Sequence, residues 1–321
     1  MAIAHDQIDQ FDTHDTHDTR VAAVEPSRRR GIVAMVLATT SWGFSTVANK
    51  MTLNHTDLRP ASQLAIQLAA SVIVLGVAVG LRGKRPSRMA WRVGRSGMLE
   101  PGASYVLALI GLSMTAASHA AIIGSLEPAF VVVGAWLVLR ARVARATVAL
   151  MTATLIGAVL VVTGASGGES AASAAGDLLL VASVVCAAGY VLLSSHRAGT
   201  VEPLTAVFTQ QVWALLVVAP VLVGTIVTGG FGPLPHGNAW LFVVVSSLLG
   251  YVIPFVLYLS ALESIPGAIA AQYLALIPLC GMIGAATFLG ERLSGRAVIG
   301  GAIVVGSLFV LSRRPTSNEV D

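Results

Sequence analysis

Charged residues are scarce in this chain, and several motifs of catalysis are missing. Only 11% of the 321 residues are Asp, Glu, Lys or Arg, whereas a soluble domain carries about 25%. The sequence has no HExxH, GxGxxG or Cys-x-x-Cys motif, and it has no P-loop. We therefore expect neither an enzyme nor a protein driven by its own ATP hydrolysis, so any energy it uses must come from a gradient.

Cysteine and organised metal ligands are also lacking. Cys186 and Cys280 are the only cysteines, and both lie within apolar stretches, which excludes a disulfide framework. The densest run of His and Asp falls in residues 1–30, where Asp recurs at every third position from Asp6 to Asp18. No ligand geometry follows from this repeat, so we expect neither a metal site nor a cofactor. The composition of the segment predicts a disordered tail.

Apolar residues dominate the chain instead. They make up 55% of it, the mean hydropathy is +0.79, and they occur in runs near the roughly 20 residues that a membrane helix needs. Because unpaired backbone groups are costly in lipid, such runs indicate helices. The sequence predicts an all-α membrane protein with ten transmembrane helices. Their approximate bounds are 31–50, 61–81, 96–113, 117–139, 147–165, 177–195, 204–228, 239–262, 266–289 and 296–312.

The basic residues are distributed unevenly between the connecting segments. If the N-terminus lies in the cytoplasm, sixteen of the 20 Lys and Arg fall in cytoplasmic segments and four in the opposite loops. The positive-inside rule therefore places both termini of this multi-pass chain in the cytoplasm, at the cell (inner) membrane. Because the basic residues follow this membrane pattern, the net charge of +4 does not predict nucleic-acid binding.

The second half of the chain repeats the first. A shift of 150 residues places Pro128 on Pro278, and a shift of 146 places Gly43-Phe44 on Gly189-Tyr190. Each half holds five predicted spans. Because five is odd, the second half enters the membrane from the opposite side, which predicts two inverted five-helix repeats with a substrate site between them near the bilayer midplane. The predicted segments are a cytoplasmic tail (1–30), a first repeat (31–165), a second repeat (166–312) and a second tail (313–321).

Two carboxyls lie within predicted spans, where an ionisable side chain costs at least about 2.5 kcal/mol to insert. Glu127 is near the middle of the fourth span and is followed by Pro128, which removes a helical hydrogen bond and frees a carbonyl. Glu100 precedes Pro101 nearer a membrane surface, five residues after Arg95. We expect both carboxyls to bind substrate or protons. The alternatives are an interhelical hydrogen bond for Glu127 and an ion pair of Glu100 with Arg95.

Further polar and aromatic residues lie within the spans. An amide or a phenol there can hydrogen-bond a substrate, or equally a neighbouring helix. Trp42 and Tyr190 lie away from the interfacial belt, so their rings can stack on a substrate or pack against other helices. The predicted substrate- or proton-binding residues are Glu127, Glu100, Trp42, Gln67, Tyr190, Gln211, Gln272 and Tyr273, and the predicted helix-breaking prolines are Pro101, Pro128, Pro254 and Pro278.

A set of landmarks is spread over both halves. They are Tyr258, Ala261-Leu262, Pro278, Gly290-Glu291, Leu293, Gly300-Gly301 and Gly306 in the second half, and Trp42-Gly43, Lys50 and Leu126–Phe130 in the first. With them the chain resembles the EamA family of the drug/metabolite transporter superfamily, over about residues 31–312. The resemblance implies ten helices in two inverted repeats, cytoplasmic termini, a central cavity, and export of amino acids or other small metabolites across a bacterial inner membrane.

Two positions depart from the pattern of that family. Arg140-Ala141 stands where the first repeat is expected to carry Gly-Glu, and Gln67 stands where a basic residue is often found. The first change removes a loop contact that is structural in the family pattern. The second removes a group that would favour an anionic substrate.

Three functions are consistent with these features. The first is a secondary transporter that exports small metabolites, such as amino acids or related amphipathic compounds, by alternating access, with protons as a coupling ion and the lipid bilayer around it. The second is a non-transporting membrane sensor or scaffold that uses its acidic N-terminal tail and fails without residues 1–30. The third is an intramembrane enzyme with Glu100 and Glu127 as a carboxyl pair. The repeat and its interrupted helices favour the first.

Overall fold

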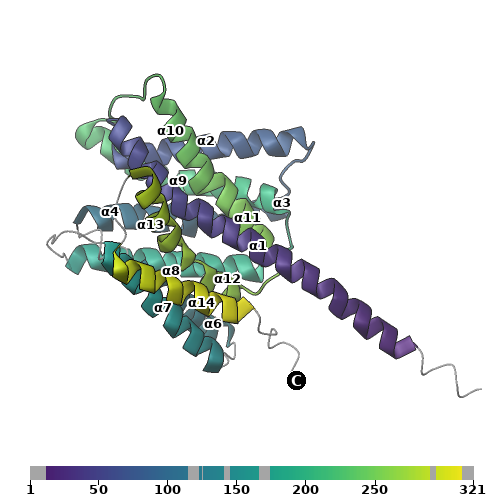
Figure 1. Ribbon diagram of the computed structural model, residues 1–321. Helices are drawn as coiled ribbons and strands as arrows, with labels where there is room; N and C mark the ends of the chain where they lie inside the picture. Colours follow the sequence, from purple (N-terminus) through teal and green to yellow (C-terminus); the bar gives the residue numbers. More distant parts are fainter. Residues whose placement is uncertain are drawn as a thin grey trace, which may run out of the picture.

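The computed structural model describes residues 12–114, 123–124, 126–140, 145–165, 174–289 and 294–312, and over these residues it contains helices and no strand. The elements form one bundle (Figure 1). In chain order they are α1 (Asp12–His55), α2 (Pro60–Leu81), α3 (Arg88–Gly94), η1 (Arg95–Met98), η2 (Leu99–Ala103), α4 (Ser104–Met114), α6 (Glu127–Leu139), α7 (Arg145–Ala165), α8 (Ala174–His196), α9 (Pro203–Gly229), α10 (Ala239–Ser247), η3 (Leu248–Val252), α11 (Ile253–Leu262), α12 (Gly267–Tyr273), α13 (Leu276–Leu289) and α14 (Gly295–Ser312).

The predicted all-helical membrane architecture is confirmed. Within the described residues, six helical stretches are long and apolar enough to cross a bilayer: Ser27–Asn49, Pro60–Leu81, Ala174–His196, Pro203–Gly229, Ala239–Leu262 and Ile269–Phe288. Shorter apolar helices lie where the fourth, fifth and tenth spans were predicted: Glu127–Val138, Val148–Leu160 and Val298–Val310. The third predicted span, 96–113, falls on the interrupted run formed by η1, η2 and α4. The count of ten stays a prediction, because residues 115–122, 141–144 and 166–173 lie outside the described residues.

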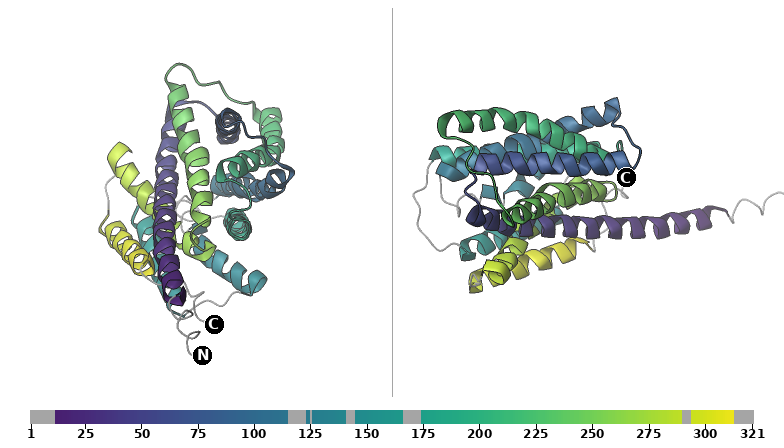
Figure 2. Two further views of the ribbon diagram at one scale, coloured as in Figure 1. Left: turned by 90° about the vertical axis from the view of Figure 1, so that its right-hand side faces the viewer. Right: turned by 90° about the horizontal axis from the view of Figure 1, so that it is seen from above.

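The packing of the helices repeats between the two halves of the chain. Helix α1 of the first half packs against α11 and α13 of the second half. Its counterpart α8, in the second half, packs in the same way against α4 and α6 of the first half. The counterparts α2 and α9 pack against each other, and so do α7 and α14 at the edge of the bundle (Figure 2). The main helix pairs therefore recur between the two halves, as expected of a two-repeat fold.

Two counterpart spans are interrupted by a π-helical turn beside a proline. The π-turn η2 contains Pro101, and Glu100 next to it has an extended backbone with φ −144° and ψ 129°. In the other half the π-turn η3 ends directly before α11, whose second residue is Pro254. Proline has no N–H to donate to the preceding turn, so both spans lose helical hydrogen bonds at this point. Such turns inside helices often occur at functional sites.

The next pair of counterpart spans is interrupted in a different way. Helix α6 begins at Glu127 with Pro128 in its first turn, and α13 begins at Leu276, after a turn, with Pro278 in its first turn. Proline is tolerated there because the first N–H groups of a helix have no partner within it. The sequence predicts Glu127 and Pro128 inside a continuous span. In the structure they begin a helix, so the carboxyl lies at a helix N-terminus.

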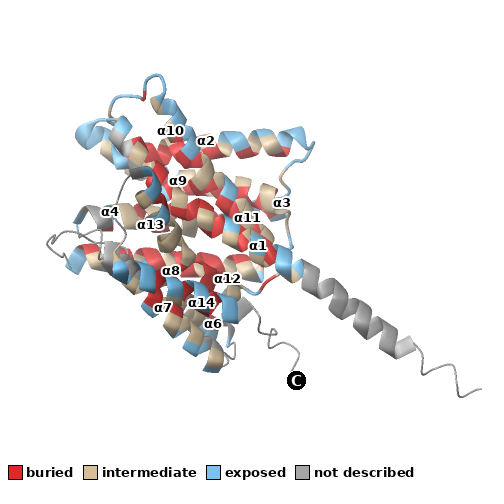
Figure 3. Cartoon of the chain, in the orientation of Figure 1, coloured by how far each residue is buried: buried red, intermediate tan, exposed pale blue. Residues whose placement is uncertain are grey.

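Buried residues gather where the helices face one another, and apolar residues on the outer faces are exposed (Figure 3). Ile73 is 66% exposed, Leu137 62% and Val227 79%. Leucine, isoleucine and valine exposed in this number would be unfavourable in water, but they match the apolar interior of a bilayer. The core between the helices contains a group of aromatic rings together with many small residues.

An ion-pair cluster joins α2 to α9 at one end of the bundle. Glu202, which precedes α9, accepts hydrogen bonds from Lys84 Nζ at 2.6 Å and from Arg82 Nη1 at 2.9 Å. The hydrogen bond from Lys84, together with the charge of both basic groups, lowers the pKa of the Glu202 carboxyl. The pair is partly exposed, so it contributes little stability on its own.

The N-terminal helix reaches beyond its predicted span. Helix α1 is described from Asp12, within the stretch 1–30 for which the sequence predicts a disordered tail. Once a helix is nucleated, each added residue gains a hydrogen bond at low cost, so a polar stretch can extend the helix that follows it. Residues 1–11 and 313–321 lie outside the described residues.

Candidate functional site: a cavity between the two repeats

A cavity of about 240 Å³ lies where the interrupted spans come together. Small-molecule sites are roughly 300–1,000 Å³, so this one suits a small solute. Both halves of the chain contribute to its lining. The lining residues are Trp42, Ser45, Thr46 and Asn49 from α1, Glu100 and Tyr105 from η2 and α4, Glu127 from α6, Tyr190 and Val191 from α8, Tyr258 from α11, and Leu274 and Ile277 beside the turn between α12 and α13.

Both carboxyls predicted from the sequence line this cavity. Glu100 reaches it from the extended residue of η2, and Glu127 reaches it from the first residue of α6. The N–H groups of a first helical turn carry partial positive charge, which stabilises a carboxylate. The expected alternative for Glu100, an ion pair with Arg95, is not among the ion pairs of the described residues. The Arg95 guanidinium lies over the ring of Trp213, 5.9 Å from its centroid.

An aromatic cluster forms one wall of the cavity. Trp42, Tyr190 and Tyr258 line it. Tyr258 is 5.9 Å from Tyr190 in a stacked arrangement and 5.8 Å from Trp42, measured between ring centroids. Phe255, which is fully buried, lies behind them, 5.1 Å from Trp42 and 5.9 Å from Tyr190. Such edge and offset contacts stabilise ring pairs and hold these rings in place.

The indole of Trp42 also hydrogen-bonds to the backbone of the interrupted eighth span, which consists of α10, η3 and α11. Because Pro254 has no N–H, the carbonyl of Gly250, four residues earlier, loses its helical donor. Trp42 Nε1 donates to this oxygen at 3.1 Å. Gln211 Nε2 donates to the neighbouring carbonyl of Tyr251 at 2.9 Å. The predicted site residue Gln211 therefore supports the π-turn and does not line the cavity.

We expect Trp42→Phe to lower the thermal unfolding temperature of the detergent-solubilised protein by about a few degrees. The substitution keeps a ring but leaves the buried Gly250 carbonyl without its donor, which costs about 1–3 kcal/mol. A scanning fluorimetry melt measures the shift. Trp240→Phe is the matched control, because Trp240 is 41% exposed and its indole makes no hydrogen bond to the described residues. An equal shift in both variants would show that the Gly250 bond contributes nothing.

The amide of Gln67 lies behind the cavity and holds one of its lining residues. Gln67 Nε2 donates to Asn49 Oδ1 at 2.7 Å and to Ser246 Oγ at 2.6 Å, and Gln63 Nε2 donates to the same Asn49 oxygen at 2.9 Å. Asn49 is thus fixed by its oxygen, and its side chain lines the cavity. Gln67 acts on the cavity through Asn49.

Of the three remaining predicted residues, two lie away from the cavity and one lines it. Gln272 and Tyr273 are buried on α12 and do not line the cavity, and the Gln272 amide has no hydrogen-bond partner among the described residues. Tyr190 lines the cavity and donates through its hydroxyl to Gln210 Oε1 at 3.3 Å. Gln210 Nε2 in turn donates to Ser96 Oγ at 2.9 Å, which links the second repeat to the first.

Sequence reasoning missed several residues of the lining. Ser45, Thr46 and Asn49 follow Trp42 at helical spacing, so the face of α1 that carries Trp42 could have been extended to them. Tyr258 stood out only as a landmark of the family resemblance. Tyr105 gave no signal, because its inward orientation depends on the interruption at η2.

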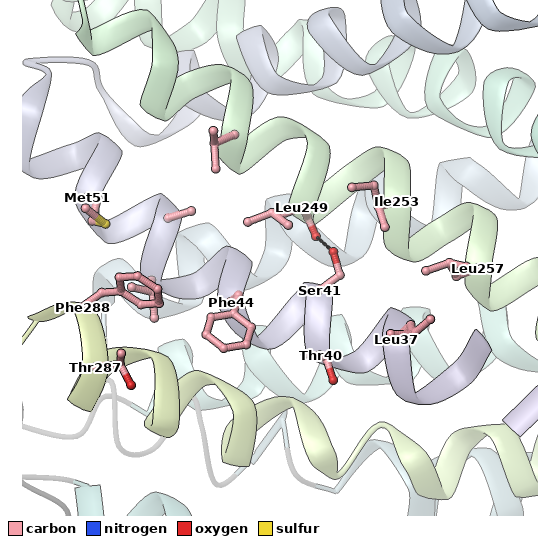
Figure 4. Close-up of a pocket in the computed structure, with 13 residues that line it drawn as sticks. Leu37, Thr40, Ser41, Phe44, Met51, Leu249, Ile253, Leu257, Thr287 and Phe288 are labelled. Atoms are coloured by element: carbon pink, nitrogen blue, oxygen red, sulfur yellow. Dashed lines mark hydrogen bonds between the residues drawn. The ribbon is translucent and has the colours of Figure 1, made fainter. Parts of the chain in front are cut away.

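A larger hollow of about 740 Å³ lies on the opposite face of α1, between α1, α10, α11 and α13. Its lining is almost entirely apolar and includes Leu37, Phe44, Met51 and Phe288 (Figure 4). The hydroxyl of Ser41, one of its few polar groups, donates to the Leu249 carbonyl at 2.8 Å (Figure 4). None of the described residues that line it is charged, so its lining offers less than that of the smaller cavity to orient a polar solute.

A model of the EamA-like transporter family matches residues 29–163 and 174–313, which together make up most of the chain. The chain belongs to the EamA-like transporter family. The match falls on both repeats and confirms the family resemblance noted in the sequence. It makes this chain a multi-pass membrane transporter of the drug/metabolite type.

Comparison with solved structures supports the same fold. The crystal structure of another protein superposes on this chain with a TM-score of 0.71 and 20% sequence identity. The superposition covers 90% of this chain and 98% of the other protein's chain. At that identity the likeness shows the fold alone. No curated protein sequence shows significant similarity to this EamA-like chain.

Proposed function

We propose that this chain is a secondary transporter that exports small amphipathic metabolites across the cell membrane by alternating access. The observation that carries the proposal is the cavity that both repeats enclose, with Glu127 and Glu100 in its lining. Interrupted helices that meet at such a cavity are typical of secondary transporters. Five spans in each repeat give the halves opposite orientations, so that one bundle can rock against the other with both termini in the cytoplasm.

Glu127 is the group we assign to coupling. A carboxyl can hold a proton when the cavity is empty and exchange it for the amine of a substrate. Each exchange would move a proton in one direction across the membrane and a substrate in the other. The proton gradient then supplies the energy, because a chain without a P-loop is not expected to hydrolyse ATP. The other titratable groups that line the cavity with Glu127 are Glu100, Tyr105, Tyr190 and Tyr258.

The direct test is transport by the purified full-length chain in proteoliposomes with an imposed pH gradient. An efflux-linked growth screen, in which a sensitive host expresses the protein and is challenged with amino acids, analogues and drugs, supplies the candidate substrates. We expect accumulation of at least one small solute that collapses when an ionophore removes the gradient. Solute uptake at the same rate with and without the pH gradient would contradict proton coupling. The absence of uptake of every solute tested would contradict transport.

The N-terminal tail separates transport from the sensor alternative. We expect removal of residues 2–26, which leaves Arg28 to Arg30 as the cytoplasmic anchor, to change the initial transport rate by less than about twofold, because a segment of this polar composition has few apolar residues with which to stabilise a membrane bundle. Flux in proteoliposomes containing equal amounts of protein measures the effect. A sensor or scaffold that works through its tail would instead lose its activity, and complete loss of flux would count against our proposal.

The enzyme alternative requires Glu100 and Glu127 to act on one substrate. Both do line one cavity, so their placement alone does not separate the two functions. Membership of a family of transporters favours movement of the solute over its conversion. Mass analysis of the solute recovered from the proteoliposomes separates the two, since a transporter returns it unchanged.

A further inference from the structure

Among the described residues, the lining of the cavity between the repeats has acidic and aromatic groups but no basic group. Glu100 and Glu127 are its acidic side chains, and no Lys, Arg or His is among the described residues that line it. We propose that the cavity selects a small organic cation that carries no carboxylate, such as an amine or a quaternary ammonium compound. This inference rests on the proposed transport function and names the class of its substrate.

Charge excludes other classes of ligand. A buried charge needs a partner of opposite sign, and an unpaired one is strongly unfavourable. A cation entering the cavity finds two carboxyls. The carboxylate of an amino acid or an organic acid would lie beside the same two groups, and the part of the lining that the structure describes has no basic side chain to pair with it. An amine should therefore bind better than the amino acid from which it differs only by the carboxylate.

The aromatic wall supplies a second kind of attraction for a cation. Trp42, Tyr190 and Tyr258 line the cavity, and the centroid of the Tyr258 ring lies within about 6 Å of the other two. The faces of such rings carry partial negative charge, and several rings around one point bind quaternary ammonium groups. Phe255 fixes the rings from behind, so the wall is formed before any ligand enters.

The hydroxyl of Tyr258 provides a third observation. Tyr258 is 1% exposed, and its hydroxyl has no hydrogen-bond partner among the described residues. Buried hydroxyls are normally paired, so this one, on a residue that lines the cavity, has a hydrogen-bonding position that the described residues leave unused. A cation with a hydroxyl or an N–H group can supply that partner, whereas the neighbouring Tyr190 hydroxyl is already bonded to Gln210.

Matched pairs of ligands test this selectivity on the full-length purified protein. Choline and glycine betaine share a trimethylammonium group, and only glycine betaine has a carboxylate. Phenethylamine and phenylalanine form a second pair. Binding is measured as the ligand-dependent rise in unfolding temperature, which grows with ligand concentration over Kd. We expect choline and phenethylamine to bind at least about tenfold more tightly than their carboxylate-bearing partners, a difference of about 1.4 kcal/mol.

Variants locate the effect in the cavity. We expect Glu127→Gln to weaken choline binding at least about tenfold, and Glu263→Gln, an exposed carboxyl at the end of α11, to leave it unchanged. Tyr258→Phe keeps the ring and removes the hydroxyl, so it should weaken choline about threefold or more and leave tetramethylammonium, which cannot form that hydrogen bond, unaffected.

Three outcomes would overturn the inference: equal or tighter binding of glycine betaine or phenylalanine, no binding by either cation, or equal losses in the Glu127 and Glu263 variants. These results are independent of the transport test. If an amino acid is accumulated under a pH gradient, transport stands and cation selectivity fails. If the cations bind but no solute crosses the membrane, cation selectivity stands and the proposed transport fails.

Discussion

Replacing Glu127 by Gln should abolish solute accumulation driven by a pH gradient while the protein remains folded. Glutamine has nearly the shape of glutamate but cannot exchange a proton or pair with a cation. Loss of one partner of a buried charge pair costs about 2 kcal/mol or more, so we expect the gradient-driven initial rate to fall at least about tenfold. The measurement is uptake into proteoliposomes containing equal amounts of each protein, with and without the gradient.

Two further variants show what the effect means. Glu263→Gln removes an exposed carboxyl outside the lining and should keep the rate of the unmodified protein. Glu100→Gln removes the other carboxyl of the cavity, so comparison of the two shows which carboxyl is coupled to the proton. Gradient-driven uptake that is unchanged in Glu127→Gln would rule out the proton role and leave Glu127 as part of the polar lining only.

Much of the fold could be predicted from hydropathy and internal repetition. Apolar runs of this length correspond to helices because a helix pairs the backbone groups of a lipid-embedded segment within itself. The shift that aligns Pro128 with Pro278 aligns two helices, α6 and α13, that each begin with a proline in the first turn. The exact form of the interruptions could not be predicted. Whether a proline such as Pro101 lies in a π-turn or begins a new helix depends on which neighbouring groups take up the freed carbonyls, and those groups come from distant segments.

The site was predictable in its charges and less so in its amides. A carboxyl in a membrane span is costly enough to indicate a special environment, and both such carboxyls line the cavity. Amides are cheaper to bury and pair equally well with other helices. Gln67 illustrates this, because it contacts Asn49 and not the cavity. Asn49 lies beside Lys50 at the end of a span and has no sequence feature that distinguishes it from an interfacial residue.

Gly97→Ala should lower the thermal unfolding temperature of the protein sharply, although it adds only one methyl group. Gly97 belongs to η1, and a Cβ at this position would overlap the backbone carbonyl of Gln210 on α9. Backbone cannot rotate away as a side chain can, so the two elements would have to separate. Overpacking of this kind costs about 1–3 kcal/mol or more. It would also disturb the bond from Gln210 to Ser96 and so the support of Tyr190.

The matched control is Gly224→Ala. Gly224 lies on α9, the helix that carries Gln210, and nothing lies within 4 Å of an added Cβ there. In a helix interior that change stabilises by about 0.5–1 kcal/mol, because alanine restricts the unfolded chain. We therefore expect the thermal unfolding temperature to fall in Gly97→Ala and to hold or rise in Gly224→Ala. If both variants have the same thermal unfolding temperature, η1 and α9 are not in backbone contact. The Tyr190 side of the cavity would then lack the rigid support that a site selective for small solutes requires.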